Sequence, residues 1–119
     1  MLHTTSGKDL NKLLKQLHVP DFDIVRKGDL HKSHASNVII NLDDDGKGTH
    51  WVAMNRPKKL YFDSYGQAPP KEVPRNYKHS TKIIEGINSE DCGQLCCLWL
   101  HYINYRSQPE FFDLFKSLY

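Results

Sequence analysis

A run of apolar residues at helical spacing begins at Cys92 and continues to Ile103. Its members recur at the i, i+3, i+4 and i+7 positions of a helix, at Leu95, Cys96, Trp99, Leu100 and Ile103. An apolar stripe this dense needs packing partners around much of its circumference. The sequence therefore predicts a largely buried central helix that begins near Cys92.

Two further helices are predicted near the ends of the chain. Ser6 followed by Asp9 resembles a capping box, and the apolar residues Leu10, Leu13, Leu14 and Leu17 then follow at helical spacing before Pro20. Ser107 and Glu110, on either side of Pro109, form a second start signal. The helix that follows this signal is expected to have one apolar face, which is made by Phe111, Leu114, Phe115 and Leu118.

Short strands are predicted between these helices. The β-branched or aromatic runs at 38–40, 49–55 and 60–63 are separated by the turn signals at 43–48 and 56–58, which indicates an antiparallel meander. Another strand is predicted at 81–84, whereas 19–36 indicates a loop with a short strand at 24–25. We therefore predict a single α+β domain spanning 1–119, with a mixed or antiparallel sheet flanked by helices.

Composition limits the compartment and the membrane relationship. Hydrophobic residues make up 39% of the chain, but the longest apolar run, Cys96 to Leu100, is too short to span a bilayer. No charged and apolar leader pattern opens the sequence. Three cysteines, two of them adjacent, argue against a disulfide framework and for a reducing compartment. An intracellular protein without membrane insertion is expected.

Basic residues raise the question of nucleic acid. The formal net charge is only +2, but Arg56, Lys58 and Lys59 cluster tightly, and Arg75, Lys78 and Lys82 recur nearby. Such a cluster can contact a nucleic acid, although solvated surface lysines are the commoner explanation. Both interpretations stay open at this stage.

Cysteine, histidine and aspartate could form a nucleophilic site. Cys92 lies in the first turn of the predicted central helix, where free backbone N–H groups and the helix dipole stabilise an anion such as a thiolate. His50 is the one histidine inside a clear strand pattern, and Asp63 at the end of the next strand could orient its ring. The alternatives are a buried apolar cysteine and a turn-initiating aspartate. No metal site is predicted, because no CxxC pair with matching histidines is present.

Three segments together resemble the adenovirus-type (adenain-like) cysteine proteases. They are residues 48–53 (GTHWVA), 61–66 (YFDSYG) and 88–101, which contains Cys92-Gly93-x-x-Cys96-Cys97-x-x-Leu100-His101. A wider stretch that includes 39–43 and Pro69-Pro70 is similar to the shorter relatives carried by Polinton-like elements and virophages. More distantly, the same order of motifs is found in the SUMO-specific proteases. The resemblance spans roughly residues 8–103.

The resemblance implies a role for each matching residue. Cys92 corresponds to the nucleophile, His50 to the general base and Asp63 to the orienting acid. Trp51 corresponds to the aromatic residue after the histidine, and we assign it to substrate binding. The implied reaction is peptide-bond hydrolysis through an acyl-enzyme, on capsid or other virion precursor proteins cut near small residues. The implied fold is α+β, with the cysteine helix packed on a sheet.

The resemblance also implies where and with what the protein works. It implies a monomer in the host cytoplasm or nucleus, or in the virion, acting on precursor proteins. No cofactor is expected, while stimulation by DNA through the basic residues stays open. Two alternative functions are a weak or inactive relative that binds capsid or nucleic acid, and a deconjugase of a ubiquitin-like protein.

One position departs from the family pattern. The family places a glutamine a few residues before the cysteine, where its amide donates to the oxyanion, and this chain has Glu85 there. An ionised carboxylate cannot donate, and loss of one such donor typically costs about 10²- to 10³-fold in rate. Glu85 could donate if it is held protonated in a dry site, or Asn88 or Gln94 could replace it.

Overall fold

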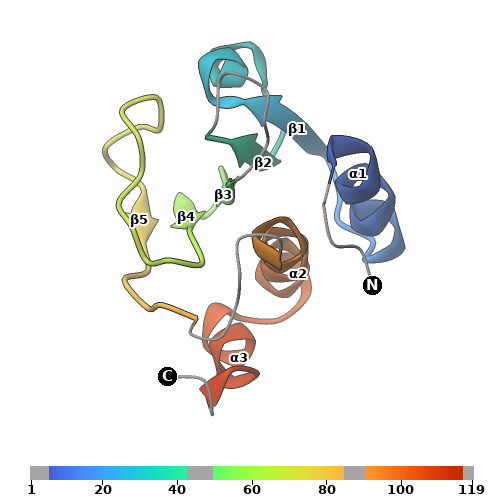
Figure 1. The fold of residues 1–119 in the computed structure, drawn as a ribbon, viewed down its shortest axis with the longest axis vertical. Helices are drawn as coiled ribbons and strands as arrows, with labels where there is room; N and C mark the ends of the chain where they lie inside the picture. The colour runs from blue at the N-terminus through green and yellow to red at the C-terminus, as the bar shows by residue number, and fades with distance from the viewer. Residues whose placement is uncertain (1–5, 43–49, 85–90, 117–119) are drawn as a thin grey trace.

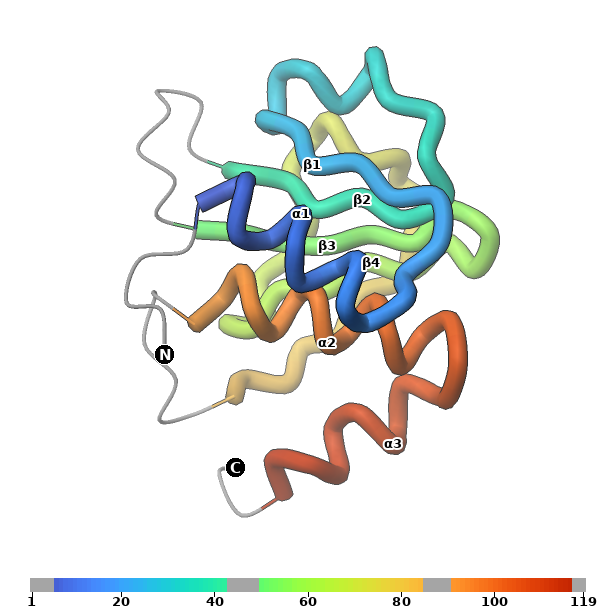
Figure 2. The backbone as a smooth tube through the Cα atoms, turned by 90° about the vertical axis from the view of Figure 1, so that its right-hand side faces the viewer, coloured from blue at the N-terminus to red at the C-terminus, as the bar shows by residue number. Residues whose placement is uncertain are grey.

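The protein is built on a mixed five-stranded sheet with helices against it (Figures 1 and 2). The structure, a computed structural model, describes residues 6–42, 50–84 and 91–116. The strands are β1 Phe22–Arg26, β2 Asn37–Asn41, β3 Trp51–Asn55, β4 Leu60–Phe62 and β5 Lys78–His79. The helices are α1 Gly7–Gln16, the 3₁₀ helix η1 Lys27–Lys32, α2 Cys92–Tyr105 and α3 Gln108–Asp113. The predicted α+β class is confirmed.

The strands lie in chain order across the sheet, from β1 at one edge to β5 at the other. β2, β3 and β4 form the predicted antiparallel meander. The two outer pairs, β1 with β2 and β4 with β5, are parallel. A parallel pair cannot be closed by a tight turn, and the connection from β1 to β2 is made through η1.

Alternation along the central strands separates two apolar cores. In β3, Trp51 and Ala53 face the core that contains α1, α2 and α3, whereas Val52 and Met54 face a smaller core with residues of η1 and of the loop before β5. This follows from the two-residue period of a strand. Every residue of β2 and β3 is buried, because both faces of the sheet are covered there.

The helix signals in the sequence correspond to real helix starts. Ser6 is the N-cap of α1 and exchanges hydrogen bonds with Asp9, so the capping box is confirmed. Ser107 is the N-cap of α3 and accepts a hydrogen bond from the Glu110 N–H at 3.3 Å. The predicted central helix begins at Cys92, and its whole apolar stripe is buried.

Polar contacts fix α2 on the sheet at its far end. The Asn104 side chain donates to Asn37 Oδ1 on β2 at 2.9 Å, and Asn55 on β3 donates to the same oxygen at 2.8 Å. Lys58, in the turn between β3 and β4, donates to the Ile103 carbonyl at 2.7 Å. The C-terminal half of the helix therefore has a defined position against both central strands.

The prediction of a strand at 81–84 is wrong. The last strand is β5, a few residues earlier, and Thr81 to Ile84 run without a ladder. Ile84 is buried and its N–H donates to the Ser64 carbonyl, but Ile83 is 51% exposed. The neighbouring segment is a turn rather than a strand, so β propensity alone could not form a pair there.

Two smaller predictions also need correction. The 19–36 segment contains the longer strand β1 and the helix η1 rather than a loop with a two-residue strand. In α3, Phe112 is buried in place of the predicted Leu114, which is 51% exposed, because the helix ends at Asp113. The predicted turn at 43–48 and Leu118 lie outside the described residues.

Gly66 allows a tight turn directly after β4. Its φ is +68°, and its N–H closes the turn onto the Asp63 carbonyl at 2.8 Å. A Cβ at this position would lie 2.5 Å from the Thr81 carbonyl oxygen. We predict that Gly66→Ala lowers the free energy of unfolding by about 1–3 kcal/mol, through backbone strain and this clash, in chemical denaturation experiments.

Gly7 provides the matched control. It opens α1, and a Cβ there would make an ordinary contact with Ile24 Cγ2 at 3.8 Å. Gly7→Ala should leave stability unchanged or raise it by up to about 1 kcal/mol, because alanine favours the helix. Equal losses in the two variants would contradict the assignment of strain to Gly66.

Candidate active site

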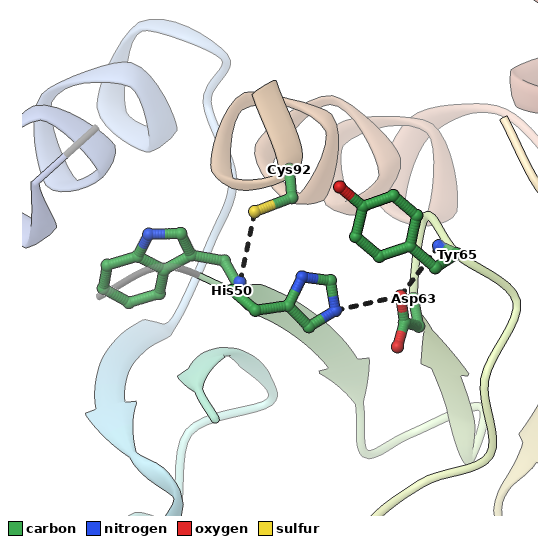
Figure 3. Close-up of polar contacts among 5 residues, drawn as sticks. His50, Asp63, Tyr65 and Cys92 are labelled. Atoms are coloured by element: carbon green, nitrogen blue, oxygen red, sulfur yellow. Dashed lines mark hydrogen bonds and ion pairs between the residues drawn. The ribbon is translucent and has the colours of Figure 1, made fainter. Parts of the chain in front are cut away.

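Cys92 is the first residue of α2, so its thiol lies at the positive end of the helix dipole. The backbone N–H of Trp51, the first residue of β3, donates to Cys92 Sγ at 3.2 Å (Figure 3). Both features favour negative charge on the sulfur. The Cys92 side chain is fully buried, so a reagent reaches the sulfur only after neighbouring groups move.

His50 and Asp63 come from the ends of two paired strands. His50 directly precedes β3 rather than lying within it, and its carbonyl accepts a hydrogen bond from the Leu42 N–H at 3.1 Å. Asp63 directly follows β4 and is buried. The antiparallel pairing of β3 with β4 brings the two together, with His50 Nε2 at 3.1 Å from Asp63 Oδ1.

The two ring nitrogens of His50 face different partners. Nε2 contacts Asp63, and a carboxylate there selects the tautomer in which Nε2 carries the proton. Nδ1 is buried and points toward Cys92 (Figure 3). The ring therefore stands between a carboxylate and a thiol, as proton transfer between nitrogen and sulfur requires.

The surroundings of His50 favour its charged form. Burial by itself lowers the pKa of His50, but the hydrogen bond to Asp63, the nearby Cys92 sulfur and the charges on both groups outweigh this effect. Together they raise the pKa of His50 from 6.5 to about 9. Below that pH the folded protein holds an imidazolium beside Cys92, and the charge is lost as the pH rises through about 9.

Tyr65 is a site residue that the sequence analysis missed. Its ring stacks on the His50 imidazole, with 5.0 Å between ring centroids and 17° between planes. Its backbone N–H also donates to Asp63 Oδ1 at 2.8 Å. The available signal was an aromatic residue two positions after the candidate acid, in the Asp63-Ser64-Tyr65-Gly66 turn.

The other predicted residues occupy different environments. Trp51 packs its indole into the core on the helix side of the sheet and is only 6% exposed. Cys96 and Cys97 are buried, and burial raises the pKa of the Cys96 thiol well above its usual range and that of Cys97 to about 12. Glu85 and Asn88 lie outside the described residues, whereas Gln94 lies in the first turn of α2.

Two of the basic residues stabilise the fold itself. The Arg56 guanidinium donates to the backbone carbonyls of Ser33 and Ala35, and Lys58 donates to the end of α2. Their charge is thus directed at backbone oxygens. Within the described parts of the chain, no group of three or more metal-ligating side chains occurs, and no helix is long and apolar enough to cross a bilayer.

Comparison with known proteins finds similarity to a viral protein. No protein-family model matches the chain. A protein named Protease from bovine adenovirus 2 is 28% identical over an alignment of 114 residues, and the match covers 74% of this chain. The match takes in 56% of the length of that relative. The similarity supports a relationship to a viral protease, while the resemblance to Polinton, virophage and SUMO-specific enzymes stays a prediction.

The charge on His50 can be tested with two alkylating reagents. Because an imidazolium attracts the carboxylate of iodoacetate, the ratio of Cys92 alkylation rates with iodoacetate and iodoacetamide should fall as the pH rises through about 9. In His50→Gln the ratio should not change with pH. Intact-mass kinetics with peptide mapping measure both rates. A ratio in the native chain that stays flat across this range would contradict the His50 assignment.

Proposed function

We propose that this chain is a cysteine endopeptidase that processes viral or virus-like precursor proteins. The observation that carries the proposal is the arrangement of Cys92 at the start of α2, His50 with Nδ1 facing it, and Asp63 at 3.1 Å from His50 Nε2. The similarity to the adenovirus relative named Protease supports the same reaction class and the viral setting.

The first half of the reaction is acylation. The Cys92 thiolate attacks the peptide carbonyl carbon, the C–S bond forms, and the carbonyl π electrons move to oxygen. The positive end of α2 stabilises the negative charge that develops near the sulfur. His50 then gives its Nδ1 proton to the amide nitrogen. The electron pair on oxygen re-forms the carbonyl as the C–N bond breaks, so an amine leaves and a thioester remains on Cys92.

The second half is hydrolysis of the thioester. His50 Nδ1 accepts a proton from water, whose oxygen attacks the acyl carbon, and collapse of the intermediate returns the thiolate and releases a carboxylic acid. Asp63 accepts the Nε2–H bond throughout and stabilises the imidazolium when it forms. In this proposal Trp51 contributes a backbone N–H to the sulfur, and its indole backs the substrate site from the core.

Fewer basic residues are available to bind DNA than the sequence suggested. Since Arg56 and Lys58 contact backbone carbonyls, stimulation by DNA would depend mainly on Lys59, Arg75 and Lys78, which are exposed. A polyanion bound there would act through the β4–β5 edge of the sheet. We retain this as the proposal for a nucleic-acid partner.

Cleavage assays test the proposed function directly. The chain is incubated with a peptide library and with viral capsid precursors, and new N-termini are identified by mass spectrometry. Cys92→Ala should abolish cleavage because the nucleophile is lost, and His50→Ala should lower kcat/KM by about 10²- to 10⁴-fold. Cys97→Ala, the same change on the same helix away from His50, should retain kcat.

The outcomes separate the alternatives. Cleavage that survives Cys92→Ala would overturn the proposal. Cleavage confined to fusions of ubiquitin or SUMO would replace it with deconjugation. A folded chain that cleaves nothing but binds capsid protein or DNA would replace it with a binding module.

A further inference from the structure

Tyr65 contacts both partners of the candidate catalytic pair. Its ring lies nearly parallel to the His50 imidazole at 5.0 Å, and its N–H holds Asp63 Oδ1 at 2.8 Å. That oxygen is the one that His50 Nε2 contacts at 3.1 Å. A single residue thus fixes the acceptor of the histidine hydrogen bond and covers one face of the histidine ring.

The His50 ring needs such support. One hydrogen bond fixes the position of Nε2 but leaves the ring able to tilt about the line from Nε2 to Oδ1, and the terminal torsion of histidine has a broad minimum. Nδ1 faces the Cys92 thiol, which is the group whose proton transfer its direction must serve. The tilt of the ring decides whether the Nδ1 proton points at Cys92 or past it, so a contact with the ring face is required.

The turn that carries Tyr65 is itself rigid. It begins at buried Asp63, is closed by the Gly66 N–H at 2.8 Å, and has Gly66 at a positive φ beside the Thr81 backbone. The turn therefore fixes the Tyr65 backbone, and the ring that it carries stacks on His50. Its hydroxyl points toward the start of α2, away from the face that stacks on His50 (Figure 3).

We propose that Tyr65 is a positioning residue whose ring holds the His50 imidazole in the plane that directs Nδ1 at Cys92. The inference rests on the proposed protease function and assigns Tyr65 no contact with the reacting atoms. The electron-rich face of the ring also favours the protonated imidazole, because aromatic faces attract cations. In this proposal the aromatic ring of Tyr65 positions His50 and stabilises its protonated form. The Tyr65 hydroxyl takes no part and donates no proton.

Three substitutions separate the ring from the hydroxyl. Tyr65→Phe keeps the stacked face and removes the hydroxyl, whereas Tyr65→Leu and Tyr65→Met keep apolar bulk and remove the face. All three retain the backbone N–H that holds Asp63. Thermal unfolding identifies any variant that has lost its fold, and two variants without the aromatic face guard against the failure of one.

The first readout needs no substrate. The rates of Cys92 alkylation by iodoacetate and iodoacetamide are measured as the pH is varied. In Tyr65→Phe the rates and the midpoint of their ratio should match the native chain. In the Leu and Met variants the midpoint should fall by about half a pH unit, because the imidazolium loses the aromatic face.

The second readout is turnover of a cleaved peptide. In the Leu and Met variants kcat should fall by about 10- to 100-fold, because the proton donor is misaligned, while KM changes less than about twofold. A purely structural role would alter the unfolding midpoint without moving the pH midpoint of the alkylation ratio.

Failure of this inference differs from failure of the proposed function. Folded Leu and Met variants that match the native chain in both readouts would overturn the role of Tyr65 and leave the protease in place. If Tyr65→Phe were as impaired as Tyr65→Leu, the effect would belong to the hydroxyl, and the proposed role of the ring would be overturned as well. A native chain with a pH-independent ratio and no cleavage would overturn both.

Discussion

The hydrogen bond from the Trp51 N–H to Cys92 Sγ ties the first residue of β3 to the first residue of α2, across 41 positions of sequence. His50 directly precedes Trp51, so the same contact also brings the backbone of the histidine close to the thiol. Asp63 then follows from the antiparallel pairing of β3 with β4. The remaining features of the site depend on how α2 is seated on the sheet.

The position of α2 on the sheet is fixed by contacts at both ends of the helix. At its start, Cys92 faces β3, and at its end Asn104 and the Ile103 carbonyl are bound by Asn37 and Lys58. Between them, the buried stripe of α2 packs on the apolar face of the sheet. Interiors pack at near-crystalline density, so a helix anchored in this way has little freedom to slide, and the thiol keeps its position against His50.

The sequence predicted much of the fold, and its failures have common physical causes. The capping box at Ser6, the N-cap at Ser107 and the strand β2 came from local signals, which the structure confirms. The strand predicted at 81–84 failed because pairing needs a neighbouring strand, and the chain beside it turns at Gly66. The prediction that Leu114 is buried was wrong because α3 ends at Asp113, before the apolar pattern in the sequence ends.

For the candidate site, residue types and order along the chain were enough to single out Cys92, His50 and Asp63, because helix starts and strand ends are local features. The sequence by itself also determined the helix on which the cysteine lies and the meander that carries the other two. Only the tertiary structure decided which ring nitrogen faces Asp63, that the Trp51 N–H points at the sulfur, and that Tyr65 covers the imidazole. These are contacts between side chains and backbone groups of different elements, whose directions depend on how α2 packs against the sheet and how the chain turns after β4.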